Sequence, residues 1–340
     1  MKDQIHEKAL VTGGGGFLGK AIAGALLKRG TGVFSFSRKD HPDLAAMGVT
    51  QIRGDLCDYP AVENAAKGVD VIYHTAAKAG VWGKFNDYWQ PNVLGTRHVI
   101  AACRKHGVRR LIYTSSASVV YNGRNMTGGD ESLPYPAAYM THYPRTKAMA
   151  EQMVIQAADP GLLTIVIRPH LIWGPGDNHL IPRIIQRANR LVRIGDGKNV
   201  ADTIYIDNAA EAHLLAADNL RKNPALSGRT YFISQGDPMP VWEMINRILQ
   251  AAGLPPVRRS IPVGPAWVIA ALMELIYKSF NIDGEPQLTR FLVRELSTSH
   301  WYDISAAKRD LGFFPGVTTQ EGFDRLEQWL GARNRLKASE

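Results

Sequence analysis

The sequence of 340 residues contains only two cysteines, Cys57 and Cys103. Two cysteines argue against the disulfide framework of a small secreted protein and against a Cys-rich metal site. No histidines stand at the HExxH spacing of a zinc enzyme, so we expect no metal centre. A positively charged segment followed by an apolar one is also missing near the first residues. We therefore expect no secretory signal and a cytoplasmic location.

Long apolar runs and blocks of one charge are missing too. The longest apolar run, VGPAWVIAALM at residues 263–273, is interrupted by Glu274. It is shorter than the roughly 20 residues of a membrane-spanning helix, but it can line a pocket or contact a membrane surface. The formal net charge is +9, yet Lys and Arg are scattered and do not alternate with aromatic residues. We therefore expect no nucleic-acid partner.

Short runs rich in β-branched residues alternate with helical patterns in the first half of the chain. Such runs include KALVTG at 8–13, GVFSFS at 32–37 and VDVIYHTAA at 69–77. The alternation predicts βαβ units, and therefore an α/β fold with a parallel sheet between two layers of helices. After Pro169 the alternation gives way to loops rich in Gly, Pro and His. We predict a larger domain of residues 1–169 plus about 200–235, and a smaller, discontinuous one of about 170–200 plus 236–335.

The stretch VTGGGGFLGK, residues 11–20, places Gly13, Gly16 and Gly19 between a predicted strand and an amphipathic helix. The helix opens with Phe17 and Leu18. A glycine-rich turn can be only a turn, but a strand, this turn and a helix in that order suit a dinucleotide pyrophosphate. We therefore predict that the larger domain is a doubly wound, Rossmann-type sheet that binds a dinucleotide cofactor.

The end of the second predicted strand indicates which dinucleotide is bound. In NAD-binding sheets an acidic residue about 20 positions after the glycines binds the ribose 2′-hydroxyl. Here Ser37 and Arg38 stand at that position. A hydroxyl and a guanidinium both suit a 2′-phosphate, so we predict a preference for NADP(H), with NAD(H) as the weaker cofactor. The alternative is that the two residues form only a solvated basic turn.

The stretch THYPRTKAMAEQ, residues 141–152, has a tyrosine and a lysine four residues apart, Tyr143 and Lys147. Pro144 is tolerated in a first helical turn, so both side chains are predicted to share one face of a helix. Taken alone, such a pair is more often part of a helix surface than of an active site.

Several motifs in order raise the significance of this pair. They are TGGGGFLG (12–19), GDL (54–56), HTAA (74–77), NVLGT (92–96), TSS (114–116), YxxxK (143–147), IRP (167–169) and DTIYIDNAA (202–210). With them the chain resembles the extended short-chain dehydrogenases/reductases over nearly its whole length. The resemblance implies an enzyme that acts on CH–OH groups, and a homodimer.

The same resemblance implies roles for individual residues. Tyr143 would be the general acid/base, Lys147 would hold the nicotinamide ribose and lower the pKa of the tyrosine, and Ser116 would polarise the substrate carbonyl. Ser115 is the alternative to Ser116, because the motif aligns only to within one or two positions. The further cofactor contacts implied are Asp55, Leu56, Ala76, Ala77, Lys78, Thr114 and Pro169.

Within that group, residues 167–185, 193–217 and 233–249 resemble the 3β-hydroxysteroid dehydrogenase branch. They are especially similar to sterol-4-carboxylate 3-dehydrogenases and to the bacterial 2-alkyl-3-oxoalkanoate reductases of long-chain olefin synthesis. The resemblance implies an NADP(H)-dependent reduction of a 3-oxo group, or oxidation of a 3-hydroxyl, beta to a carboxylate on a lipid-like substrate. It also implies partner enzymes in lipid metabolism.

Candidate substrate contacts are of two kinds. For the carboxylate they are His170, His179 and Arg183, with His142 as a further contact beside Tyr143; for the tail they are Trp82, Trp89, Trp173, Trp267, Ile269 and Leu272. Taken alone, a residue of either kind is more often part of the core or the surface than a substrate contact. The alternatives are a steroid or sterol 3β-hydroxy dehydrogenase, a nucleotide-sugar epimerase or dehydratase, and a non-catalytic dinucleotide sensor. The intact Tyr143 argues against the sensor.

Overall fold

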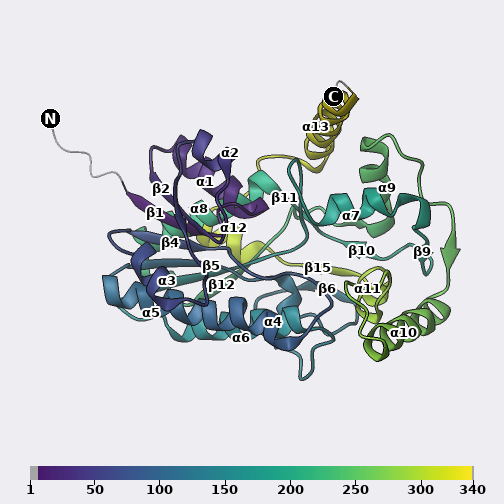
Figure 1. The fold of residues 1–340 in the computed structure, drawn as a ribbon, viewed down its shortest axis with the longest axis horizontal. Helices are drawn as coiled ribbons and strands as arrows, with labels where there is room; N and C mark the ends of the chain where they lie inside the picture. The colour runs from purple at the N-terminus through teal and green to yellow at the C-terminus, as the bar shows by residue number, and fades with distance from the viewer. Residues whose placement is uncertain (1–6, 339–340) are drawn as a thin grey trace.

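The centre of the molecule is a parallel sheet of seven strands in the order β3–β2–β1–β4–β5–β7–β12 (Figure 1). The strands are β1 (Lys8–Thr12), β2 (Gly32–Ser37), β3 (Thr50–Arg53), β4 (Val71–His74), β5 (Arg110–Thr114), β7 (Leu163–Pro169) and β12 (Arg229–Ile233). The computed structural model describes residues 7–338. The strand order reverses between β1 and β4, which is where ligands bind in open α/β sheets. The predicted α/β, Rossmann-type fold is confirmed.

Helices cover both faces of this sheet (Figure 1). On one face lie α1 (Phe17–Lys28) and α8 (Ile206–Lys222); on the other lie α3 (Tyr59–Ala65), α5 (Gly95–His106) and α6 (His142–Gln156). Side chains of β1 alternate between the two layers, because Ala9 and Val11 pack on the first and Leu10 on the second. Burial on both faces explains why these strands read as continuous apolar runs.

A second region lies beyond the carboxyl ends of the strands (Figure 1). Its four-stranded sheet has the order β13–β10–β15–β6, from β13 (Met239–Pro240), β10 (Val200–Ala201), β15 (His300–Tyr302) and β6 (Met126–Gly129). Its helices are α7 (Leu180–Gln186), α9 (Val241–Ala251), α10 (Val263–Ser279) and α11 (Arg290–Glu295). Strand β6 comes from the first half of the chain, so distant segments build this sheet.

Further elements complete the two regions. They are α2 (Pro42–Ala46), α4 (Phe85–Trp89), β8 (Ile172–Trp173), β9 (Arg193–Ile194), β11 (Ile204–Tyr205), β14 (Ser260–Ile261), α12 (Ser305–Leu311) and α13 (Thr319–Ala338). Helix α12 packs on α8 and β12, although it follows the second region in sequence. The domain boundaries stay a prediction, and residues 1–6 of the first domain lie outside the described residues. Across residues 7–338, the search for a helix with the length and apolarity needed to cross a membrane found none.

Candidate active site

The glycine-rich loop joins β1 to α1 and leaves no room for side chains. Gly13 has a φ of +71°, and a Cβ there would lie 2.9 Å from the Cα of Ala76. A Cβ on Gly19 would lie 2.3 Å from the Gly13 carbonyl oxygen. Gly16 caps α1, so the amino end of this helix opens onto the loop. The glycines allow a pyrophosphate to approach the backbone closely, and the free N–H groups at the amino end of α1 can bind it. We call this arrangement the glycine cradle.

The other predicted cofactor residues surround this loop. Phe17 approaches Gly176 of the loop after β8, and Leu18 is buried in the core. Ala76 and the exposed Ala77 and Lys78 follow β4. The Lys78 amide donates to the side-chain oxygen of Asn92 at 2.8 Å, so Asn92, the first residue of the NVLGT motif, positions this segment.

Ser37, Arg38, Asp55 and Leu56 lie at the carboxyl ends of β2 and β3. These strands are in register, and the Gly54 amide donates to the Ser37 carbonyl at 3.0 Å. The Ser37 hydroxyl donates to the Lys39 carbonyl at 2.8 Å, while Arg38 is exposed. Asp55 is exposed and Leu56 is buried. The structure thus brings these residues to the same edge of the sheet as the glycines.

Helix α6 begins at His142, with Tyr143 and Pro144 in its first turn. Lys147 follows one turn later and is 2% exposed. Its Nζ donates to the Thr114 carbonyl at 2.5 Å and lies 4.1 Å from the ring centre of Tyr113. Burial lowers the pKa of Lys147 to about 7, because the cation loses its hydration, and the charge of Glu151 opposes this shift.

Glu151 belongs to a buried polar cluster that we did not predict. It is fully buried, and Arg168 Nη2 donates to its Oε1 at 2.5 Å. The Tyr135 hydroxyl donates to the same oxygen at 2.6 Å. Glu151 follows Lys147 by four residues, which could have pointed to it, whereas Arg168 comes from β7. The cluster places a compensated carboxylate one helical turn from Lys147.

Of the two candidate serines, Ser116 is the one that interacts with the tyrosine. Burial raises the pKa of Tyr143 to about 12, and the nearby Ser116 hydroxyl opposes this shift. Ser116 Oγ also lies 2.8 Å from Ser118 Oγ. The Ser115 hydroxyl is buried and has no hydrogen-bond partner among the described residues. The geometry favours Ser116, and its catalytic role stays a prediction.

Thr114 and Pro169 end two neighbouring strands at this place. Thr114 Oγ1 lies 2.8 Å from Nε2 of the buried His213, and Pro169 is buried at the end of β7. The backbone of Ser115 donates to the Ile167 carbonyl at 2.6 Å. This hydrogen bond fixes the end of β5 against β7.

The predicted substrate contacts fall into different environments. His142 packs against the rings of Phe85 at 5.6 Å and Tyr88 at 6.3 Å, directly beside Tyr143. Burial lowers the pKa of His142. Trp82 meets Tyr277 of α10 edge-on at 6.3 Å. His142 and Trp82 therefore lie along one side of the site.

Two of the predicted contacts are corrected by the structure. Trp173 is fully buried, packs on Phe323 at 4.5 Å and donates to Thr203 at 3.0 Å, so it offers no surface to a substrate. His170 is buried with Nε2 3.1 Å from His300 Nδ1, and burial lowers its pKa to about 3. A neutral, enclosed imidazole cannot supply a cationic contact to a carboxylate.

The remaining candidates lie nearer the surface. Arg183 donates to Glu285 at 2.5 Å, and His179 is exposed just before α7. Trp89 is half-buried, and Trp267 lies 4.8 Å from the Arg294 guanidinium. Ile269 and Leu272 point outward from α10, where they are exposed. Of the residues predicted to contact the carboxylate, Arg183 and His179 therefore remain as candidates.

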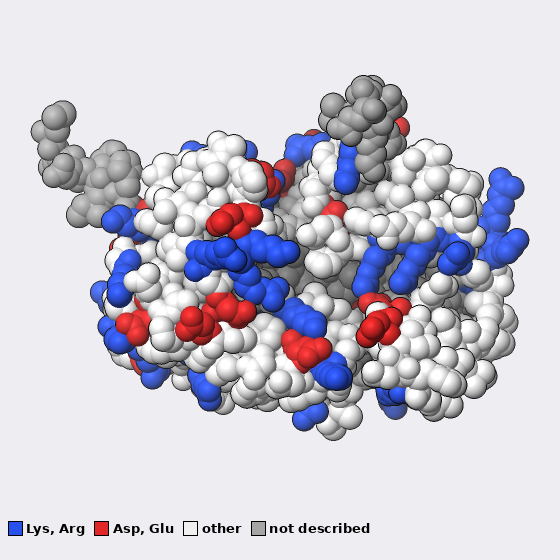
Figure 2. Space-filling view, in the orientation of Figure 1, with Lys and Arg blue, Asp and Glu red and all other residues white. Residues whose placement is uncertain are grey.

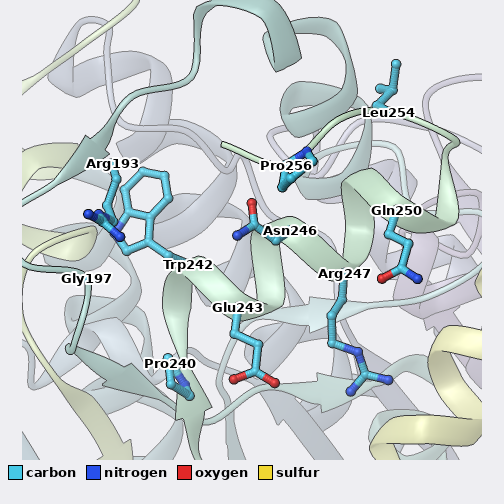
Figure 3. Close-up of a pocket in the computed structure, with 10 residues that line it drawn as sticks. All are labelled: Arg193, Gly197, Pro240, Trp242, Glu243, Asn246, Arg247, Gln250, Leu254 and Pro256. Carbon is cyan, nitrogen blue, oxygen red and sulfur yellow. The ribbon is translucent and has the colours of Figure 1, made fainter. Parts of the chain in front are cut away.

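A separate cavity of about 570 Å³ opens beside α9 (Figure 3). Its lining comes from β9, β13, α9 and the loop that follows α9, and includes Arg193, Trp242, Glu243 and Arg247. None of the predicted catalytic or cofactor residues lines it. It is distinct from the site around Tyr143.

Comparison with known proteins agrees with this geometry. The model of the 3-beta hydroxysteroid dehydrogenase/isomerase family matches residues 10–263. A 2-alkyl-3-oxoalkanoate reductase from Stenotrophomonas maltophilia is 49% identical over 325 residues, which cover 94% of this chain and 98% of that protein. The decarboxylating sterol-4-alpha-carboxylate 3-dehydrogenase of Mus musculus is 35% identical over 329 residues, covering 95% of this chain and 90% of that protein.

Among solved structures, MoeE5 in complex with UDP-glucose and NAD superimposes with a TM-score of 0.74 at 25% identity. The match covers 97% of this chain and 99% of MoeE5. Family model, relatives and fold agree over nearly the whole length. The chain is therefore an oxidoreductase that belongs to the 3-beta hydroxysteroid dehydrogenase/isomerase family.

Proposed function

We propose that this protein reduces a 2-alkyl-3-oxoalkanoate to the 2-alkyl-3-hydroxyalkanoate with NADPH. The observation that carries the proposal is the placement of Tyr143 and a buried Lys147 one turn apart on α6, in a chain 49% identical to a 2-alkyl-3-oxoalkanoate reductase. The relative covers almost the entire chain, so the substrate side is matched as well as the cofactor side. The sterol dehydrogenase relative is named for a substrate that also bears a carboxylate.

The side chains divide the chemistry between them. The glycine cradle fits a dinucleotide, which supplies the hydride when it is bound. Ser116 donates a hydrogen bond to the substrate carbonyl oxygen, and Tyr143 gives that oxygen its proton as charge develops there. Lys147 stabilises the phenolate that remains. The carboxylate of Glu151 favours the charged form of Lys147 and opposes the effect of its burial.

The substrate itself imposes a further requirement. A 3-oxo acid loses carbon dioxide to give an enol when the bond to its carboxylate is aligned with the π orbitals of the ketone. The site therefore has to hold the carboxylate away from that alignment. Arg183 is the cation that remains for this role after the correction of His170, with His179 beside it. Arg183 is paired with Glu285, so a bound carboxylate would compete with that side chain.

The preference for NADPH rests on the end of β2. Ser37 and the exposed Arg38 lie there without an acidic residue that would repel a 2′-phosphate. MoeE5, which was solved with UDP-glucose and NAD, shares the fold, but a shared fold does not transfer a substrate. A homodimer, a cytoplasmic location and pathway partners stay predictions.

The test is a product assay with the purified protein, NADPH and a synthetic 2-alkyl-3-oxo acid, trapped quickly and analysed by mass spectrometry. We expect one 2-alkyl-3-hydroxy acid for each NADPH consumed. Ketone alone, without NADPH consumption above a control lacking enzyme, would contradict the proposal. Parallel reactions with a 3β-hydroxysteroid, a sterol carboxylate and a UDP-sugar identify the alternative if one of them is turned over instead.

A further inference from the structure

The outer surface of α10 is unusually apolar. Ten large apolar side chains are exposed among the described residues, and seven of them fall within residues 268–282. The seven are Val268, Ile269, Leu272, Leu275, Ile276, Phe280 and Ile282. Five of them lie on α10, where steps of one, three and four residues place them on one face, and Phe280 and Ile282 follow the helix directly. We call the seven the α10 face.

The opposite side of α10 fixes the helix in this orientation. Ala266 and Ala270 are buried there, and the buried Glu274 accepts from the Arg290 backbone and guanidinium at 2.8 Å each. Rotating the helix to hide its apolar residues would expose these alanines and break the Glu274 pair. The apolar face is therefore held outward by specific contacts.

Helix α10 lies at the edge of the molecule, at the lower right of Figure 1. Figure 2 shows few charged residues over α10 and α11 on the visible side. The exposed cations of this segment stand at its ends: Arg258 and Arg259 come just before β14, and Lys278 lies in the last turn of α10. They outnumber the one exposed acid there, Asp283, which follows Ile282. The α10 face, with cations at both ends, suits the surface of an anionic bilayer, where the apolar side chains would meet acyl chains and the cations lipid phosphates.

The α10 face fits a second copy of the chain less well. In a two-fold pairing that lays the two α10 helices along each other, the cations at the ends of one helix would approach cations of the other copy. On a bilayer the same cations would meet lipid phosphates. We propose that α10 is an interfacial helix whose apolar face inserts into the surface of a membrane that contains anionic lipids.

The position of α10 links this contact to the site. Tyr277 and Lys278 lie against Trp82, the latter with its Nζ 5.6 Å from the ring centre. The loop that carries Trp82 continues to Phe85, which touches His142 beside Tyr143. A lipid-like substrate leaving the membrane next to α10 would reach Tyr143 along this loop, and this last step rests on the proposed function.

The experiment measures binding of the full-length protein to sedimenting vesicles, without cofactor or substrate. We expect binding to vesicles of phosphatidylglycerol and phosphatidylethanolamine, and weaker binding to phosphatidylcholine alone. The double variant Leu272→Asp/Leu275→Asp should lower the partition coefficient by at least about tenfold. Lys278→Ala should lower it roughly fivefold on the anionic vesicles only. Thermal melting checks that each variant is folded.

The matched control is Phe314→Asp, because Phe314 is 68% exposed but lies outside α10. It should bind vesicles like the wild type. No binding by the wild type, or equal binding by the double variant, would overturn the proposal. A change from dimer to monomer in the double variant without vesicle binding would instead make the face an interface between copies. The assay needs no turnover, so its failure is distinct from a failure of the reductase assay.

Discussion

Around Lys147 the structure buries polar groups and pairs them, whereas along α10 it exposes apolar groups and leaves them uncovered within the described chain. Lys147 is enclosed by Thr114, Tyr113 and, one turn away, Glu151 with its partner Arg168. A proton donor works only if its charges are held in place, which requires burial and fixed partners. Contact with a lipid requires exposed apolar surface instead, so the two regions meet opposite requirements within one proposed reaction.

The largest effect expected is on the proton donor. Tyr143→Phe removes the phenol but keeps the ring, so turnover should fall roughly 10²- to 10⁴-fold while the dinucleotide binds nearly as before. Single-turnover oxidation of NADPH and a cofactor titration measure the two quantities. Tyr139→Phe is the matched control, because Tyr139 only donates to the Val119 carbonyl. If the Tyr143→Phe variant kept more than about a tenth of wild-type turnover, Tyr143 would not be the general acid.

The features that the sequence could predict are those built from residues close together in the chain, and the features that it could not predict join residues far apart. Gly13 to Gly19 and Tyr143 to Lys147 are local patterns, so the loop and the shared helix face were predictable. The partner of Glu151 was not, because Arg168 arrives from β7. The burial of His170 depends on His300, and β6 pairs with β15 from the other end of the chain. The spacing of the apolar residues also could not show that α10 turns its apolar face outward, because the bond between Glu274 and the distant Arg290 fixes this orientation.

The buried pair offers the second largest effect. Glu151→Gln leaves the Arg168 charge buried without its carboxylate, so the free energy of unfolding should fall by about 3–5 kcal/mol. Urea denaturation measures this change. Arg104→Gln is the contrast, because Arg104 pairs with Asp159 at the surface and should change stability by less than about 1 kcal/mol. Equal changes in the two variants would show that burial does not distinguish the Lys147 region from the surface.

The third prediction concerns Arg38, at the carboxyl end of β2. Its side chain is polar, like the groups around Lys147, but exposed, like the apolar side chains of α10. Arg38→Ala should raise the Michaelis constant for NADPH by roughly 10- to 100-fold, because a charge-assisted bond to the 2′-phosphate is lost. The constant for NADH should hardly change, since NADH lacks that phosphate. Steady-state kinetics with both cofactors provide the measurement. Equal effects on the two would reduce Arg38 to a surface charge.

The smallest effect is the pH dependence of the reduction, and it sharpens the comparison because burial is the largest cause of both pKa shifts. The pKa of Lys147 is lowered by burial to about 7 and that of Tyr143 is raised to about 12. Reduction requires the protonated tyrosine, which persists across this range, and the lysine cation, which is lost as pH rises above about 7. The single-turnover rate at saturating NADPH should therefore be level below this pH and fall roughly tenfold per unit above it.

Glu151→Gln extends this test, provided that the variant remains folded at the assay temperature. The Glu151 charge opposes the effect of burial on Lys147, so its removal should lower the pKa of Lys147 further and move the falling limb to lower pH. A purely structural loss would lower the rate at every pH and leave the limb where it was. A rate that stayed level up to about pH 9 in the wild type would mean that Lys147 keeps its proton, and that its burial does not set the charge of the site.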